Sequence, residues 1–151
     1  MVLETGAVVP QVTATNQDGD RVTVTFEQPS VLYFYPRDDT PGCTTEAEQF
    51  QAELETYREA GVAVYGVSTD DAESHREFAE AYDLEFDLLA DPDGKIADAF
   101  DVAMSDGATE RTTLVCAQGQ VCGIYEGVHP DGHARNVLND ILDVGLASLD
   151  D

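Results

Sequence analysis

A short apolar run followed by a proline-rich loop and a helix-forming segment constrains the fold of this chain most. Residues 31–35 read Val-Leu-Tyr-Phe-Tyr, a run of β-branched and aromatic residues typical of a fully buried strand. The loop at 36–42 contains two prolines and a glycine. From about Cys43 to Ala60 the residues favour a helix, with an apolar stripe that includes Phe50. The pattern predicts a strand, a loop and a helix, with a cysteine in the first helical turn.

The rest of the chain alternates between strand-like and helix-like segments. In chain order we expect a hairpin over 13–15 and 21–25, the strand at 31–35, the helix at 43–60, a strand at 62–67, a helix at 71–82, a strand at 86–89, a short helix at 95–100, a hairpin over 112–116 and 121–125, and a helix at 132–147. The crossover rules make the first two core strands parallel. This order is that of a thioredoxin-like α/β fold, a central mixed β-sheet flanked by helices, with an N-terminal β-hairpin. We expect residues 1–151 to form a single domain.

Acidic residues dominate the charge of this chain. There are 31 aspartates and glutamates against 7 lysines and arginines, a net charge of −24, and Lys95 is the one lysine. The acidic residues are spread over the whole sequence, so they do not form a disordered tail. Such a charge opposes binding to nucleic acid and to anionic membranes, and it costs stability unless salt screens it. One interpretation is an ordinary acidic bacterial protein; the balance favours a halophile with molar intracellular salt.

Targeting signals and cysteine usage indicate where such a chain works. No apolar stretch approaches the ~18 residues of a membrane span, and the N-terminus lacks the basic and apolar regions of a signal peptide. We therefore expect a cytoplasmic protein. Three cysteines, an odd number, fit intracellular thiol chemistry better than a disulfide scaffold. Among them Cys43 stands out, because the unpaired N–H groups and the dipole of a helix N-terminus favour the reactive thiolate.

The residues around Cys43 resemble a known active-site signature. The spacing Pro36-x-x-x-Thr40-x-x-Cys43 is similar to that of the peroxiredoxins. The longer stretch 34–44 resembles the bacterioferritin-comigratory (PrxQ) subfamily. Later segments also resemble this family: 66–70, 74–79, 88–94 and 111–114. The resemblance spans roughly residues 3–145, nearly the whole chain.

This resemblance implies a thiol peroxidase that reduces hydrogen peroxide and organic hydroperoxides without a cofactor or metal. Cys43 would be the nucleophile and would become a sulfenic acid. The backbone N–H groups of Gly42 and Cys43 would bind the substrate and the oxygen on which charge develops, and Thr40 would offer its hydroxyl to the peroxide. Pro36 would hold the loop and help to exclude water. Arg111, with its permanent charge, would favour the thiolate and stabilise the transition state.

Most of these residues also have a purely structural interpretation. Cys43 could be a small buried hydrophobic residue, Thr40 an ordinary N-cap or turn residue, and Arg111 a surface charge. The contiguous match over 34–44, in the expected strand-loop-helix context, favours the catalytic interpretation. Glu46 either orients an arginine near the site or lies on a solvated helix face, and the sequence leaves both open.

Many relatives carry a second, resolving cysteine, and this chain lacks it at the expected positions. Five residues after Cys43 stands Glu48, and the alternative position in the following helix reads Phe-Ala-Glu at 78–80. If Arg111 marks the active-site end of its strand, Cys116 lies five residues away from that end. Five residues along a strand span about 16 Å, whereas a disulfide with Cys43 needs Cα atoms within about 7 Å. A one-cysteine cycle is therefore favoured, in which an external thioredoxin- or glutaredoxin-like thiol system reduces the sulfenic acid.

The other two cysteines, Cys116 and Cys122, belong to the second predicted hairpin. A two-residue turn at 118–119 would pair Cys116 with Val121 and leave Cys122 on the opposite face, whereas a three-residue loop would place the two cysteines opposite each other. Their spacing is a weak zinc signal, so we expect reduced thiols. The histidines should pack or cap, without forming a metal-ligand set: His75, His129 and His133.

Two other functions compete with the peroxidase. Disulfide oxidoreductases share the fold, but Thr40 occupies the place of the first cysteine in a Cys-x-x-Cys motif. A redox-sensing or holdase-type interaction protein is the non-enzymatic alternative, and no motif supports it. The expected partners are peroxides and the thiol reductant, for a monomer or weak homodimer.

Overall fold

The structure is a computed structural model that describes residues 4–147. Its elements are, in chain order, β1 (Val12–Thr15), β2 (Arg21–Val24), β3 (Ser30–Phe34), α1 (Pro41–Glu59), β4 (Ala63–Ser68), α2 (Ala72–Tyr82), β5 (Asp87–Ala90), α3 (Lys95–Ala99), β6 (Met104–Ser105), β7 (Ala108–Thr109), β8 (Thr112–Ala117), β9 (Gln120–Glu126) and α4 (His133–Asp143). Every predicted strand and helix is present. Apart from the end of the last helix, the boundaries shift by one or two residues at most.

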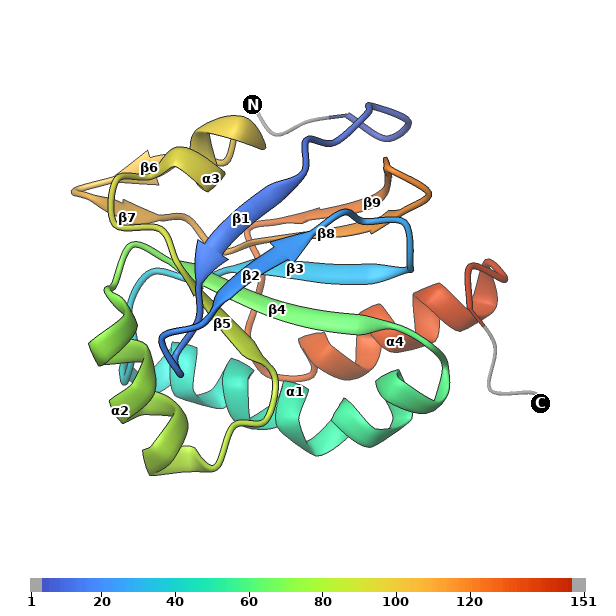
Figure 1. Ribbon diagram of the computed structural model, residues 1–151. Coiled ribbons are helices and arrows are strands. Elements are labelled where there is room, and N and C mark those ends of the chain that lie inside the picture. Colours follow the sequence, from blue (N-terminus) through green and yellow to red (C-terminus); the bar gives the residue numbers. More distant parts are fainter. Residues whose placement is uncertain (1–3, 148–151) are drawn as a thin grey trace.

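A mixed β-sheet forms the centre of the molecule (Figure 1). The strand order across it is β2-β1-β5-β4-β3-β8-β9. β3, β4 and β5 run parallel, because the helical crossovers α1 and α2 connect them. β8 is antiparallel to β3, and the hairpins β1-β2 and β8-β9 form the two edges. The predicted mixed sheet with an N-terminal hairpin is therefore confirmed.

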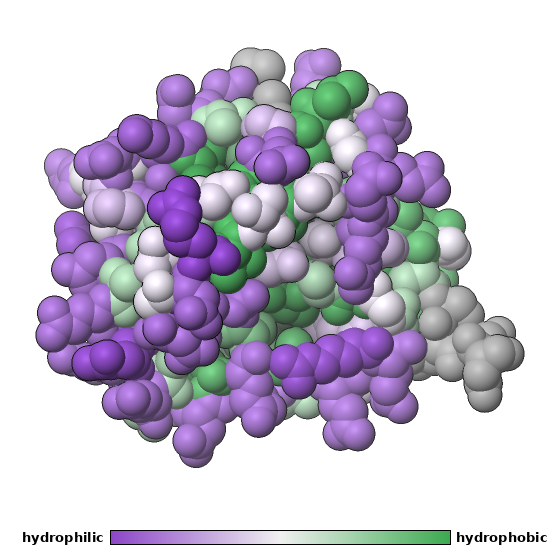
Figure 2. Space-filling model, in the orientation of Figure 1, coloured by the Kyte–Doolittle hydropathy of each residue, from purple (hydrophilic) through white to green (hydrophobic). Residues whose placement is uncertain are grey.

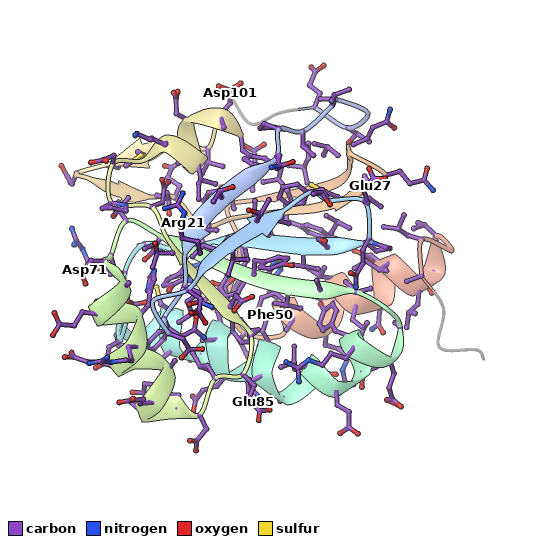
Figure 3. All side chains as sticks on the ribbon, viewed as in Figure 1. Arg21, Glu27, Phe50, Asp71, Glu85 and Asp101 are labelled. Carbon is purple, nitrogen blue, oxygen red and sulfur yellow. The ribbon has the colours of Figure 1, made fainter. Side chains whose placement is uncertain are left out.

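The side chains of β3 alternate between two buried cores. Tyr33 points into the core beneath α1, α2 and α4, where its ring stacks on Phe50 with centroids 4.5 Å apart. Figure 3 shows Phe50 between the sheet and α1. Phe34 points to the opposite face and packs with Phe100, next to α3. The run at 31–35 is apolar throughout because both faces of this strand are covered.

Two features differ from the prediction. The helix expected to continue to residue 147 ends at Asp143, because Gly145 adopts a φ of 75° in the left-handed region where helices commonly terminate. The small hairpin β6-β7 is an addition that the apolar pattern does not predict. Its turn is Asp106-Gly107, with positive φ at both residues. This dipeptide is a strong hairpin signal and is the feature by which the sequence could have revealed the turn.

The face of the molecule shown in Figure 2 is predominantly polar, because hydrophilic side chains cover most of it. Within residues 4–147, no helix has both the length and the apolar character needed to cross a membrane. The polar surface agrees with the dispersed acidic residues of the sequence, which need contact with water and salt.

Candidate active site

The predicted nucleophile lies where the loop after β3 enters α1. The helix begins at Pro41, and Thr40 is its N-cap. Cys43 is therefore the third helical residue, and the residue is only 1% exposed. The first helical hydrogen bond runs from the N–H of Thr44 to the carbonyl of Thr40, at 2.8 Å. The N–H groups of Gly42 and Cys43 precede this bond and have no helical partner, so they favour an anion beside the sulfur.

Arg111 reaches this cysteine from the neighbouring strand. It directly precedes β8, and the pairing of Thr112 with Phe34 brings the start of β8 beside the end of β3. Arg111 Nη2 donates to Cys43 Sγ at 3.4 Å. Gly42 permits this approach, since a Cβ at that position would lie 3.1 Å from Nη2. Residues far apart in the sequence thus place a permanent positive charge against the thiol.

Glu46 holds the same arginine through its other nitrogen. Glu46 Oε1 accepts from Arg111 Nη1 at 2.7 Å, and the glutamate side chain is 0% exposed. The solvated-face interpretation of Glu46 is therefore wrong, and the arginine-orienting one holds. Burial raises the pKa of Glu46 to about 7, against the pull of Arg111. Burial also disfavours the charge of Arg111, but Glu46 and then Cys43 beside it raise the pKa of the guanidinium.

Thr40 and Pro36 belong to the loop that leads to the cysteine. Thr40 Oγ1 donates to the Arg37 carbonyl at 3.2 Å and makes no capping bond to the helix. The lone pairs of this hydroxyl therefore remain available as acceptors. Pro36 is partly buried and follows Tyr35, whose N–H extends the sheet by donating to the Val67 carbonyl at 3.0 Å. The loop thus starts from a fixed position at the end of β3.

A buried histidine lies near the charge of Arg111. His133 is the first residue of α4, and its Nε2 shares a hydrogen bond with Thr113 Oγ1 at 2.8 Å. Burial, and then Arg111, lower the pKa of His133 to about 4. The imidazole is therefore uncharged at neutral pH and packs in the interior, in agreement with the prediction for this residue.

We expect His133 to make the fold sensitive to acid. The unfolded chain binds a proton on this histidine below pH 6.5, whereas the folded chain binds it only below about 4. Between these values the unfolded state holds more protons, so the stability contributed by His133 falls as the pH falls. Thermal midpoints measured from about pH 7 to about pH 4.5 should drop further for the unmodified protein than for His133→Gln, which does not titrate. Equal slopes would contradict the lowered pKa.

Cys116 is remote from the candidate nucleophile. It pairs with Ser30 at the start of β3, whereas Cys43 follows the end of that strand. Cys116 also packs in the core on the opposite face of the sheet from Cys43. Burial raises the pKa of the Cys116 thiol to about 12, so it is protonated and unreactive at neutral pH.

The hairpin that carries the last cysteine has the two-residue turn. Residues 118 and 119 both have positive φ, and Cys116 pairs with Val121. Cys122 therefore does not face Cys116; it lies exposed on the edge strand β9, and both thiols are free. The alternative with a three-residue loop is wrong for this hairpin.

A polar cluster beneath the loop is absent from the sequence prediction. Asp38, Asp70 and His75 each offer one ligand atom, and these atoms lie within 4.8 Å of one another. His75 Nδ1 lies 2.7 Å from Asp38 Oδ2, and its Nε2 lies 3.2 Å from the Leu89 carbonyl. Both ring nitrogens are already hydrogen-bonded, so the imidazole has no free lone pair for a metal ion. The three residues come from separate segments, so no local spacing reveals the cluster.

Known proteins are similar in sequence to most of this chain. Residues 5–122 match the AhpC/TSA family model. The peroxiredoxin Bcp of Bacillus subtilis is 33% identical over 154 residues, which cover 95% of this chain and 98% of that protein. The chain belongs to the AhpC/TSA family, among the peroxiredoxins of the Q/Bcp type.

Chloroplast peroxiredoxins Q extend beyond the matched region. The one from Gentiana triflora is 47% identical over 139 residues, which cover 88% of this chain. The one from Triticum aestivum is 39% identical over 142 residues, which cover 90% of this chain. This peroxiredoxin spans 64% and 65% of those two proteins, respectively.

Solved structures confirm the thioredoxin-like peroxiredoxin fold. A mutant of Xylella fastidiosa PrxQ superimposes with a TM-score of 0.90 at 27% identity, covering 95% of this chain and 98% of that one. The bacterioferritin comigratory protein of Xanthomonas campestris, studied for its alkyl peroxide reduction activity, superimposes with a TM-score of 0.83 at 32% identity. That match covers 91% of this chain and 98% of the other.

Proposed function

We propose that this peroxiredoxin reduces hydrogen peroxide and organic hydroperoxides, with Cys43 as the nucleophile. The observation that carries the proposal is the 3.4 Å contact between Arg111 Nη2 and Cys43 Sγ in the first turn of α1. The guanidinium and the helix N-terminus both act on this sulfur and favour its thiolate. The alkyl peroxide reduction activity of the Xanthomonas campestris relative supports hydroperoxides as the substrate class.

The reaction needs a thiolate, a hydroperoxide and one proton. The sulfur of Cys43 attacks the terminal oxygen of ROOH, so that an S–O bond forms and the O–O bond breaks. The OH group stays on the sulfur as sulfenic acid, while the electron pair leaves with RO⁻, which takes a proton from solvent to give an alcohol, or water where R is hydrogen. Arg111 and the N–H groups of Gly42 and Cys43 stabilise the developing charge. Thr40 accepts the O–H of the peroxide, because its own proton is donated to the Arg37 carbonyl.

We propose a one-cysteine cycle for the return to the thiolate. A first external thiol forms a mixed disulfide with the sulfenic acid of Cys43 and releases water, and a second thiolate then displaces the thiol of Cys43. A thioredoxin- or glutaredoxin-like protein is the class of reductant that supplies these thiols. The support is the position of Cys116 on the opposite face of the sheet and of Cys122 on its exposed edge.

Mass spectrometry of the oxidised protein tests the function and the cycle together. The protein is treated with one equivalent of hydrogen peroxide, without reductant, and trapped with a dione that reacts with sulfenic acids. We expect the adduct on the peptide that contains Cys43 and no disulfide from it to Cys116 or Cys122. An intrachain disulfide would refute the one-cysteine cycle alone. An unmodified Cys43 would refute the peroxidase.

We propose that the protein works in the cytoplasm of a halophile. The sequence carries 31 acidic residues. Over residues 4–147, the acidic side chains paired with an arginine are Glu46 with Arg111 and Glu53 with Arg135, and Asp38 lies 2.7 Å from His75. Most of the negative charge therefore lacks a basic partner in the fold and relies on dissolved cations.

The free energy of unfolding should accordingly increase with salt. At about 1 M salt the Debye length is ~3 Å, so repulsion between dispersed carboxylates is largely screened. We expect the thermal midpoint to rise from near-zero to above about 1 M potassium chloride. A parallel series in sulfate separates screening from the strengthened apolar burial that sulfate also causes. A midpoint that is flat or falls with chloride would show that the acidity has no such role.

A further inference from the structure

We propose that a buried ion pair between Asp38 and His75 positions the active-site loop, so that His75 is a positioning residue for the reaction. Asp38 lies in the loop between β3 and α1, and His75 lies in the first turn of α2. Their side chains are 4% and 0% exposed, respectively. The kinetic consequence rests on the proposed peroxidase function, whereas the ion pair itself does not.

The hydrogen-bond pattern around the pair supports a charged assignment. His75 Nε2 lies 3.2 Å from the Leu89 carbonyl, which can only accept, so Nε2 carries a hydrogen. Asp38 accepts from the Tyr35 hydroxyl at 2.6 Å and from the Ser74 hydroxyl at 2.7 Å. Together with His75 Nδ1 at 2.7 Å, three short bonds reach this carboxyl group and stabilise its ionised form. Nδ1 must then also carry a hydrogen, and the ring is an imidazolium.

A second carboxylate adds to the need for this cation. Asp70 Oδ2 accepts the backbone N–H of Asp38 at 2.7 Å and the Ser68 hydroxyl at 2.8 Å. Three atoms lie within 4.8 Å of one another: an oxygen of Asp70, an oxygen of Asp38 and a nitrogen of His75. Two carboxylates this close repel each other unless a positive charge lies beside them. Over the described residues, His75 is the basic side chain within salt-bridge distance of Asp38, so it is the group that can supply this charge.

The loop turns sharply next to the pair. Asp39 has a φ of 59°, a left-handed conformation that aspartate adopts more readily than most residues other than glycine. α2 holds this residue as well, since the Tyr82 hydroxyl donates to Asp39 Oδ1 at 2.9 Å. Thr40 and the first turn of α1 follow directly, so the anchoring of the loop to α2 sets the position of Cys43. A displacement of reacting groups by about 1 Å can cost about 100-fold in rate.

Nitrogen-15 NMR of the unmodified protein tests the ion pair directly. An imidazolium shows two protonated ring nitrogens, whereas a neutral ring shows one protonated and one bare nitrogen. We expect two protonated nitrogens for His75 at about pH 7.5. The His75→Asn variant assigns the signals by their loss, and the exposed His129 provides a reference ring in the same spectrum. A bare nitrogen on His75 would overturn the ion pair.

Kinetics and hydrogen exchange test the positioning role. Asp38→Asn and His75→Asn should each lower the second-order rate constant with hydrogen peroxide by about tenfold or more. The double variant should be no slower than the slower single variant, because the pair acts as a unit. Exchange of the backbone amides should become faster over residues 37–40, while that of β4 stays unchanged. Asp71→Asn is the matched control. It makes the same substitution of aspartate by asparagine at the N-cap of α2, where asparagine caps equally well.

The outcomes separate this proposal from the proposed function. Unchanged rates in folded Asp38→Asn and His75→Asn, or losses that simply multiply in the double variant, would overturn the positioning role. Where these variants do not fold, Ser74→Ala is the deciding variant, because it removes one donor to Asp38 and keeps the pair. It should slow the reaction by less than about tenfold and make amide exchange in the loop faster. No effect on the rate or on the loop exchange would overturn the proposal. If the unmodified protein consumes no peroxide, the proposed function fails, while the ring spectrum and loop exchange still decide the ion pair.

Discussion

Cys43→Ser is expected to abolish peroxide consumption, whereas Cys116→Ser and Cys122→Ser retain most of it. A serine hydroxyl remains protonated at neutral pH and forms no sulfenic acid, so the first step is lost. The other two thiols lie on the opposite face and at the exposed edge of the sheet. The measurement is the initial rate of hydrogen peroxide consumption with an excess of dithiol reductant.

Circular dichroism and the thermal midpoint of each variant provide the control for folding. Cys43 is buried, but serine has nearly the same volume and stands at a helix N-terminus, where a hydroxyl is tolerated. Cys116→Ser places a hydroxyl in an apolar core, so some loss of stability is expected there without loss of rate. Comparable losses of activity from Cys122→Ser and Cys43→Ser would rule out the one-cysteine cycle.

Arg111→Met should slow peroxide reduction by at least about tenfold while leaving the fold intact. The change removes the charge that contacts Cys43 Sγ at 3.4 Å, and with it both the support for the thiolate and the stabilisation of the departing oxygen. Glu46 loses its partner, but its pKa is already about 7, so it can take up a proton at little cost. The measurement is the second-order rate constant of the reduced enzyme with hydrogen peroxide.

Arg37→Met is the matched control for this experiment. Arg37 is exposed on the loop after β3, and its replacement changes the net charge of −24 by the same single unit. A tenfold difference between the two variants therefore reports the direct contact of Arg111 and not the overall charge. An Arg111→Met enzyme as fast as the unmodified one would show that another group activates the thiol.

The local parts of the fold follow from the sequence. The apolar run at 31–35, the prolines of the loop and the helical pattern after Cys43 lead to the observed strand, loop and helix, because strand and helix preferences act between neighbouring residues. The positive φ of Gly145 shortens the last helix, and the dipeptide at 106–107 forms a turn. Both signals are also local, but they lie in turn residues and are not part of the apolar pattern.

The contacts between residues far apart in the sequence depend on the tertiary structure. The resemblance to peroxiredoxins indicated Arg111, but its contact with Cys43 depends on the register of β3 with β8. The sequence left two roles open for Glu46, and only burial against this arginine distinguished them. The side of the sheet that Cys116 occupies likewise follows from strand register, which moves a side chain to the other face with each single-residue shift.

By itself, the sequence determined the order of strands and helices, the position of the thiol at a helix N-terminus and the acidic surface. These depend on spacing, composition and short-range preference. Only the tertiary structure joined Asp38 to His75, because a loop and a helix 37 residues apart must pack before their charges meet. Such contacts arise from packing and electrostatics between elements, and no local pattern along the chain encodes them.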